Sequence, residues 1–219
     1  MADKIQKAYQ HSKNIYDNVL TQANFWSRLY IRLFWNGVDD NEIARKTLAY
    51  LPENFNGTLL DVPVGTGVFT SGKYQSLPEA KIFCMDYSRD MLEKARLRFR
   101  KAGLENVRLK QGNVGNLPLK SGSCDIVLSM NGFHAFPDQK KAFSEVHRVL
   151  KKDGMFIACF YIKGESVQTD WLVEHVLAKK GWFTPPFQTF SELKKMLENN
   201  YAEVEISHEF SMVYFRCVK

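Results

Sequence analysis

The sequence predicts an α/β protein in which a mostly parallel sheet of seven strands carries helices on both faces. Over residues 58–161, short apolar segments alternate with segments of helical periodicity, which is typical of buried parallel strands joined by helices. Two further strand-like segments follow close together near the C-terminus and indicate an antiparallel edge hairpin. The 219 residues, 45% of them hydrophobic, suffice for a single domain with a full core.

Each element has its own signature. Asp39 and Glu42 resemble a capping box ahead of an amphipathic segment that ends at Pro52. Further helices are expected where apolar residues recur at helical spacing, over 91–102, 142–150 and 190–199. The expected strands are residues 58–62, 81–86, 107–111, 124–129, 155–161, 202–207 and 210–219, with His208 and Glu209 as the turn of the hairpin.

Composition and charge narrow the functional classes. The net charge of +6 and the basic residues between 94 and 110 fit the solvated face of a covering helix better than a nucleic-acid site. The four cysteines and five histidines lack metal-ligand spacing, so we expect buried reduced thiols and no metal. We expect neither a signal peptide nor a membrane-spanning segment, and therefore a cytoplasmic location.

A glycine-rich turn follows the first expected strand. Gly65 and Gly67 let the backbone approach a ligand at the carboxyl ends of the strands, where open α/β sheets bind ligands. Asp86 ends the next strand, 21 residues after Gly65, at the spacing for binding the hydroxyls of an adenosine ribose. Thr70 stands where a dinucleotide loop has glycine, and Asp61 would repel a pyrophosphate but attract an ammonium group. S-adenosylmethionine, with a ribose and an amino acid, fits these features.

Five motifs in order resemble the class I S-adenosylmethionine-dependent methyltransferases, in the small branch that includes ubiquinone and menaquinone C-methyltransferases (methyltransferase type 11-like). The motifs are DVPVGTG at 61–67, DYSRDMLEKAR at 86–96, QGNVGNLP at 111–118, the region 124–138, and RVLKKDG at 148–154. The resemblance covers about residues 40–162 and implies a Rossmann-like fold. Pro63 departs from the family's motif, because proline stands there in place of a glycine and has no backbone N–H.

The resemblance also implies which residues contact the cofactor. Those implied to hold the methionine part are Asp61, Pro63, Val64, Gly65, Thr66 and Gly67. Those implied to contact the ribose, the adenine or the surroundings of the sulfonium are Asp86, Tyr87, Met91, Gly112, Asn113, Val114, Met130 and Asn131. Tyr16 is implied to help close the site. The product would be S-adenosylhomocysteine.

The methyl acceptor is expected to be a small apolar or aromatic molecule. Transfer from a sulfonium mainly requires alignment of donor and acceptor. His134, after the fourth strand, is the candidate catalytic base or substrate ligand, with a packing role as an equal alternative. Aromatic residues gather in 1–35 and 171–190, outside the motifs, and are expected to line an apolar pocket. The candidates for substrate contact are Trp26, Tyr30, Tyr161 and Trp182.

These expectations divide one domain, residues 1–219, into an N-terminal helical lid (1–38), a cofactor-binding core (39–162) and a substrate-lid segment with the C-terminal hairpin (163–219). Two other functions stay open: an NAD(P)-dependent oxidoreductase and a non-catalytic S-adenosylmethionine-binding protein. The expected partner is a small molecule rather than nucleic acid, and the chain is a monomer or a homodimer. Contact of the basic amphipathic segment around Arg28 with a membrane surface is a minor alternative.

Overall fold

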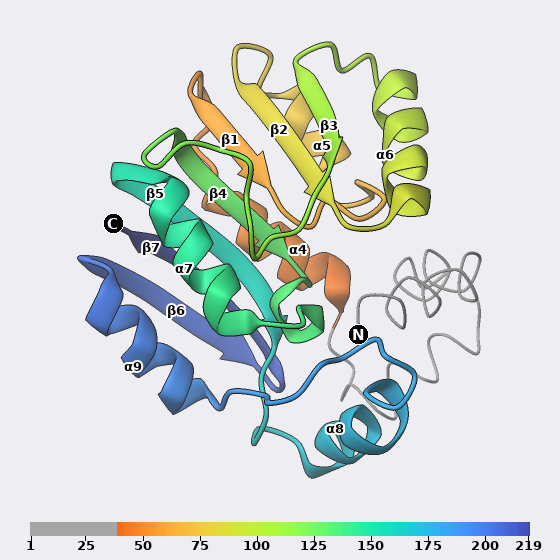
Figure 1. The fold of residues 1–219 in the computed structure, drawn as a ribbon, viewed down its shortest axis with the longest axis vertical. Coiled ribbons are helices and arrows are strands. Elements are labelled where there is room, and N and C mark those ends of the chain that lie inside the picture. Colours follow the sequence, from red (N-terminus) through yellow and green to blue (C-terminus); the bar gives the residue numbers. More distant parts are fainter. Residues whose placement is uncertain (1–38) are drawn as a thin grey trace.

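The computed structural model describes residues 39–219, which form a seven-stranded sheet flanked by helices (Figure 1). The strands are β1 (Thr58–Asp61), β2 (Lys81–Asp86), β3 (Val107–Gln111), β4 (Cys124–Met130), β5 (Leu150–Tyr161), β6 (Glu203–Glu209) and β7 (Met212–Val218). The helices are α4 (Asp40–Ala49), α5 (Ser71–Gln75), α6 (Arg89–Lys101), α7 (Gln139–Val149), α8 (Val167–Leu172) and α9 (Phe190–Asn200), with the short turns η1 (Phe133–Ala135) and η2 (Val173–Leu177).

The predicted fold class is confirmed by the strand order β3-β2-β1-β4-β5-β7-β6. Strands β1 to β5 are parallel, and β7 runs antiparallel to both β5 and β6. The chain order reverses between β1 and β4, and in sheets of this type a ligand binds beyond the carboxyl ends of the strands at that point. The N-terminal lid expected over residues 1–38 lies outside the described residues.

The C-terminal hairpin is present, but its expected turn was wrong by two residues. His208 and Glu209 pair with Val213 and Met212 inside the ladder, so the turn falls on Phe210 and Ser211. Phe210 has a φ of 46°, a left-handed conformation in which glycine or asparagine is usual. Because a bulky residue occupies that position, the sequence carries no ordinary turn signal there.

Two layers of apolar residues cover the two faces of the sheet. One cluster joins the sheet to α4, α5 and α6, and includes Ile43, Tyr74 and Phe99. The other joins it to α7 and α9, and includes Val146 and Leu197 (Figure 1). All four cysteines are buried and free, as predicted. Among residues 39–219, no helix combines the length and apolar character needed to span a membrane.

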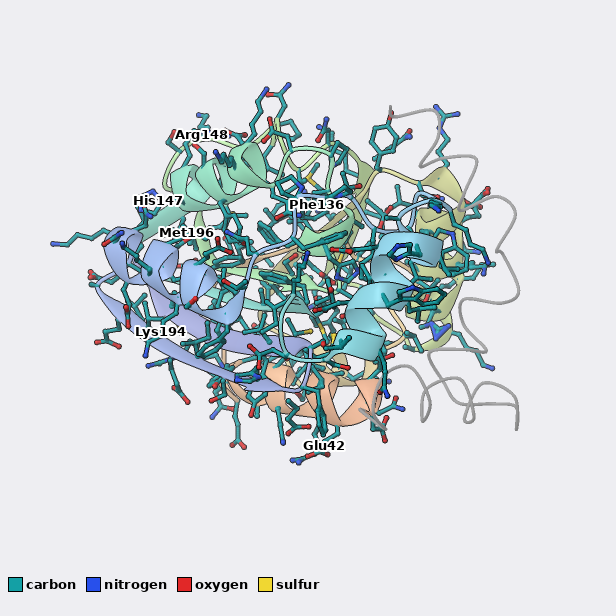
Figure 2. The ribbon with its side chains drawn as sticks, turned by 90° about the horizontal axis from the view of Figure 1, so that it is seen from below. Glu42, Phe136, His147, Arg148, Lys194 and Met196 are labelled. Atoms are coloured by element: carbon teal, nitrogen blue, oxygen red, sulfur yellow. The ribbon has the colours of Figure 1, made fainter. Side chains whose placement is uncertain are left out.

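Side-chain caps fix where the helices begin. Asp39 caps α4 by accepting from the backbone N–H of Asn41 at 2.9 Å, which confirms the predicted start of that helix. Ser88 caps α6 immediately after the end of β2, and Asp138 caps α7 by accepting from Lys141 N at 2.9 Å. The loops after β2 and β4 are therefore anchored where the next helix begins, and together with the loop after β1 they converge at one edge of the sheet. In Figure 2 Phe136 lies near the centre of the view, whereas Glu42 and Lys194 lie at its periphery.

Candidate functional site

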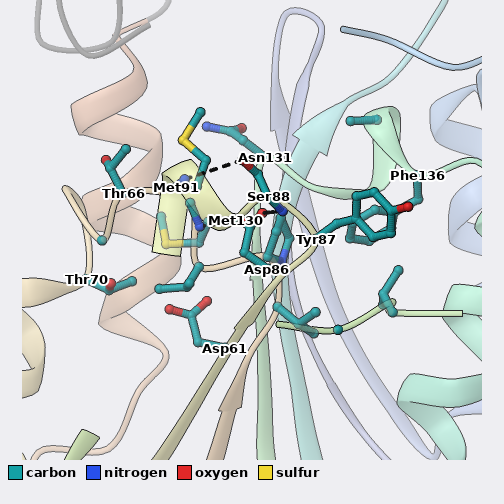
Figure 3. A pocket seen from close by; sticks show the side chains of 18 of the residues that line it. Asp61, Thr66, Thr70, Asp86, Tyr87, Ser88, Met91, Met130, Asn131 and Phe136 are labelled. Atoms are coloured by element: carbon teal, nitrogen blue, oxygen red, sulfur yellow. Dashed lines mark hydrogen bonds between the residues drawn. The ribbon is translucent and has the colours of Figure 1, made fainter. Parts of the chain in front are cut away.

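A cavity lies beyond the carboxyl ends of β1, β2 and β4 (Figure 3). It gathers segments from five places in the chain, and it includes every residue predicted to contact the cofactor within the described part. Its lining residues are Asp61, Val62, Pro63, Val64, Gly65, Thr66, Gly67, Val68, Phe69, Thr70, Asp86, Tyr87, Ser88, Met91, Gly112, Asn113, Val114, Met130, Asn131, Ala135, Phe136 and Pro137. The predicted residue Tyr16 lies outside the described residues.

The loop after β1 depends on two glycines with positive φ. Gly65 has φ 56° and Gly67 has φ 68°, conformations that side-chain-bearing residues rarely adopt. A Cβ at Gly67 would lie 2.5 Å from the Phe99 ring, whereas a Cβ at Gly65 would meet no atom of the described residues within 4 Å. Gly67 therefore allows close packing against α6, and Gly65 leaves open space in front of the loop.

Asp86 joins the ends of β1 and β2. Its Oδ2 accepts from the backbone N–H of Gly65 at 2.9 Å, and its Oδ1 accepts from that of Ser88 at 2.8 Å. The side chain is 8% exposed, and burial raises the pKa of Asp86 to about 6. Two backbone donors hold the carboxylate in place, and each oxygen keeps a lone pair for a ligand hydroxyl.

Asp61 occupies the opposite side of the cavity from Tyr87 and Phe136 (Figure 3). Its Oδ2 accepts from the hydroxyl of Tyr74 at 2.7 Å, while its buried Oδ1 has no partner among the described residues. Burial raises the pKa of Asp61 to about 7. A buried carboxylate oxygen without a donor is costly, and a cationic ligand group would relieve that cost.

Pro63 is accommodated by packing rather than by a hydrogen bond. A Cβ at Gly132 would lie 2.3 Å from the Pro63 Cδ, so the absence of a side chain at 132 makes room for the ring. The neighbouring residue Val64 keeps its backbone bond, donating to the carbonyl of Met85 at 2.9 Å. The loop thus retains its place against β2 although residue 63 has no N–H.

The end of β4 supplies a strained polar residue to the cavity. Asn131 has φ 52°, and its backbone N–H donates to the carbonyl of Cys159 at 2.8 Å. Its buried Oδ1 has no partner among the described residues. A non-glycine residue with positive φ at a site is often a functional feature.

His134 does not line the cavity, although the sequence made it the candidate base. Its ring is buried, with Nδ1 accepting from the backbone N–H of Tyr161 at 3.2 Å. It stacks on Phe183 at a centroid distance of 4.1 Å, and burial lowers the pKa of His134 to about 3. This geometry favours the packing alternative over the role of base.

Of the predicted acceptor contacts, Tyr161 and Trp182 also lie off the cavity lining, and Trp26 and Tyr30 lie outside the described residues. The hydroxyl of Tyr161 donates to Asp170 Oδ1 at 2.6 Å, and its ring packs edge-on against Phe183. Lys180 lies over the Trp182 ring at 5.3 Å. Tyr161 belongs to the apolar cluster that also holds Phe183, and Trp182 packs against that cluster.

Sequence reasoning missed several lining residues and one that supports the lining. Val62 and Ser88 lie inside motifs already identified, and Val68, Phe69 and Thr70 directly follow one of them, so taking whole motifs with a few following residues would have found all five. Ala135, Phe136 and Pro137 directly follow His134, in a region matched by a motif in which the prediction named only His134 for the acceptor side. Tyr74 carried no signal, because its hydroxyl meets Asp61 only in the folded chain.

Comparison with known proteins supports the predicted class. Residues 60–158, slightly less than half of the 219 residues, match the family described as a methyltransferase domain. This match agrees with the class predicted from the five motifs.

The chain also resembles curated sequences and solved structures. The chain is 32% identical to a demethylmenaquinone methyltransferase of Lactococcus lactis over 113 residues. The aligned part covers 51% of this chain and 45% of that protein. A methyltransferase structure from Thermotoga maritima has a TM-score of 0.71 at 20% identity, covering 98% of this chain and 99% of that one. The Bacillus subtilis YcgJ structure has a TM-score of 0.65 at 25% identity, covering 76% and 70%. The chain spans less than half the length of the first curated relatives that it matches.

Proposed function

We propose that this chain transfers a methyl group from S-adenosylmethionine to a small apolar or aromatic molecule. The observation that carries the proposal is the cavity itself, in which a glycine turn and two buried aspartates meet at the switch point of the sheet. The family match of residues 60–158 supports the reaction class.

The residues present fit the proposed cofactor. Asp86 would bind the ribose hydroxyls, and the free lone pairs of its anchored carboxylate support this role. The unpartnered Oδ1 of Asp61 suits the amino group of the methionine part. Bound there, S-adenosylmethionine supplies an electrophilic methyl group whose transfer needs mainly orientation. Two structural neighbours are described as complexes with S-adenosylmethionine.

The acidic end of the cavity argues against the oxidoreductase alternative. Asp61 and Asp86 both line the cavity, and among residues 39–219 no lysine or arginine lines it. A dinucleotide would bring a pyrophosphate with negative charge into that buried acidic surrounding, which Coulomb repulsion opposes. An ammonium and a sulfonium are instead attracted to it.

The proposed acceptor class rests on the wall formed by Ala135, Phe136 and Pro137. An apolar wall of this kind favours an apolar acceptor. Several curated relatives are named demethylmenaquinone methyltransferases, so we propose quinones and phenols as the first acceptors to test. With His134 packed away from the cavity, we propose that the protein orients an acceptor that is nucleophilic already.

Two measurements test the proposal in sequence. Isothermal calorimetry with S-adenosylmethionine, S-adenosylhomocysteine and NAD identifies the cofactor, and tight binding of NAD alone would overturn the assignment. A screen with methyl-labelled donor across quinones, phenols, amines and thiols then identifies the acceptor. Cofactor binding without transfer to any acceptor would favour the non-catalytic alternative.

A further inference from the structure

Tyr74 is fully buried, lies on the short helix α5 and does not line the cavity. Its backbone N–H donates to the carbonyl of Thr70 at 2.9 Å. Its ring packs against Phe99 at a centroid distance of 6.0 Å, and Phe99 is the ring that Gly67 approaches. The position of the Tyr74 hydroxyl is thus fixed from behind the cofactor loop.

The Tyr74 hydroxyl forms a hydrogen bond with the carboxylate of Asp61. It donates to Oδ2 at 2.7 Å, while the buried Oδ1 has no hydrogen-bond partner among residues 39–219. A carboxylate with neither oxygen held could rotate about its terminal torsion, which is broad for aspartate. The hydrogen bond selects one rotamer and leaves a single oxygen for a ligand in the cavity.

We propose that Tyr74 is a positioning residue for the amino acid part of the cofactor, holding one oxygen of Asp61 so that the other meets the cationic amino group. This inference rests on the proposed function. A buried tyrosine hydroxyl also needs an acceptor for its own stability, so the test must separate ligand positioning from core packing.

The charge environment of Asp61 supports the same role. The groups that act on the Asp61 carboxyl are Tyr74 on α5, Asp86 on β2 and the hydroxyl of Thr70. Cys84 on β2 also lies beside it, and the charge of Asp61 raises the pKa of that thiol. Burial and Asp86 raise the pKa of Asp61, and the Tyr74 hydrogen bond lowers it. Loss of the hydroxyl would therefore favour the protonated carboxyl, which attracts an ammonium group less.

Two ligands and two matched variants make the test selective. S-adenosylhomocysteine and 5′-methylthioadenosine share adenosine and a thioether sulfur, but only the former has the amino acid. Tyr74→Phe removes the hydroxyl and keeps the ring. Tyr201→Phe is the control, because Tyr201 is also buried and its hydroxyl has no partner among the described residues. Affinities are measured by calorimetry between pH 6 and pH 8, with the melting temperature of each variant.

We expect Tyr74→Phe to bind S-adenosylhomocysteine about tenfold more weakly at pH 7, the scale of one hydrogen bond to a charged group. Its affinity for 5′-methylthioadenosine should stay within about twofold of wild type. The loss of S-adenosylhomocysteine binding on acidification should also begin at higher pH than in wild type. Tyr201→Phe should bind both ligands as wild type does.

Equal weakening of both ligands by Tyr74→Phe would assign Tyr74 to packing alone and overturn the inference. Unchanged binding of both would overturn it as well. If the wild-type chain binds neither ligand, the proposed function itself fails, and the inference fails with it. Calorimetry of the wild type therefore separates the two failures before any variant is made.

Discussion

Two walls of the cavity are built in different ways. The first wall, residues 61–70 and 86–91, consists of turns and carboxylates held at the ends of β1 and β2. The second wall, residues 135–137, is backed by a segment from much later in the chain: Thr184 donates from its N–H to the carbonyl of His134 at 2.8 Å and from its hydroxyl to that of Ala135 at 3.1 Å. One wall is specified locally, and the other by contacts distant in sequence.

The largest effect on cofactor binding is expected from a substitution of Asp86 in the first wall. Replacing Asp86 with alanine removes two backbone hydrogen bonds and the proposed ribose contact, and should weaken S-adenosylmethionine binding by about 1.5–3 kcal/mol. Calorimetry measures the affinity, and thermal unfolding reports the stability. Asp39→Ala is the control, because it too removes a carboxylate that accepts a backbone N–H, from a residue that does not line the cavity. Wild-type affinity in Asp86→Ala would contradict the ribose role.

The next effect tests the role of His134, which directly precedes the second wall in the sequence. The structure favours packing, so His134→Gln should lower stability by about 1–3 kcal/mol, since Nδ1 and the stacking on Phe183 are lost. The turnover of any acceptor found should change less than the hundredfold that loss of a general base would cause. A drop of that size, with the disappearance of one limb of the pH–rate profile, would restore His134 as the base.

His134 also has a defined pH signature. Its pKa in the folded state is about 3, below the ordinary value near 6.5. The unfolded chain therefore binds a proton that the folded chain does not, and stability should fall as pH decreases from about 6.5 towards 3, by up to about 1.4 kcal/mol per pH unit. Denaturant unfolding at pH 7, 6 and 5 should show a smaller loss in His134→Gln than in wild type. An equal loss in both would remove His134 as the cause.

How much of the site was predictable follows from the same comparison. Gly65, Gly67 and Asp86 each meet a local requirement, a positive φ or a carboxylate at a strand end, and such requirements restrict the residue type at one position. His134 was chosen for its chemistry and its place after the fourth strand, and Tyr161 was named as a candidate substrate contact, yet the fold turns both towards Phe183. The turn at Phe210 was misplaced for a related reason: its conformation is imposed by the β6–β7 pairing rather than by the residue.

The glycines of the first wall allow a matched comparison of smaller size. Gly67→Ala adds a Cβ that would lie 2.5 Å from the Phe99 ring, at a φ of 68°. Gly122→Ala has nearly the same φ, 63°, with nothing within 4 Å of its Cβ. We expect Gly122→Ala to cost about 1 kcal/mol of stability, and Gly67→Ala about 1–2 kcal/mol more, with weaker cofactor binding. An equal loss of stability in both variants would show that the contact with Phe99 does not restrict the residue type at position 67.

The smallest expected effect concerns the link between the second wall and the segment behind it. Thr184→Val keeps the side-chain shape and the backbone N–H but removes the hydroxyl that donates to Ala135 at 3.1 Å. Because that residue is partly exposed, the loss of stability should be only about 0.5–1 kcal/mol. Since Ala135 lines the cavity and Asp86 is untouched, the KM of the acceptor should rise while the affinity for S-adenosylmethionine is unchanged. A parallel loss of cofactor affinity would mean that the two walls are coupled in binding. The difference between a locally specified wall and a remotely supported wall would then apply to how the sequence determines the site, and not to how the site binds its two ligands.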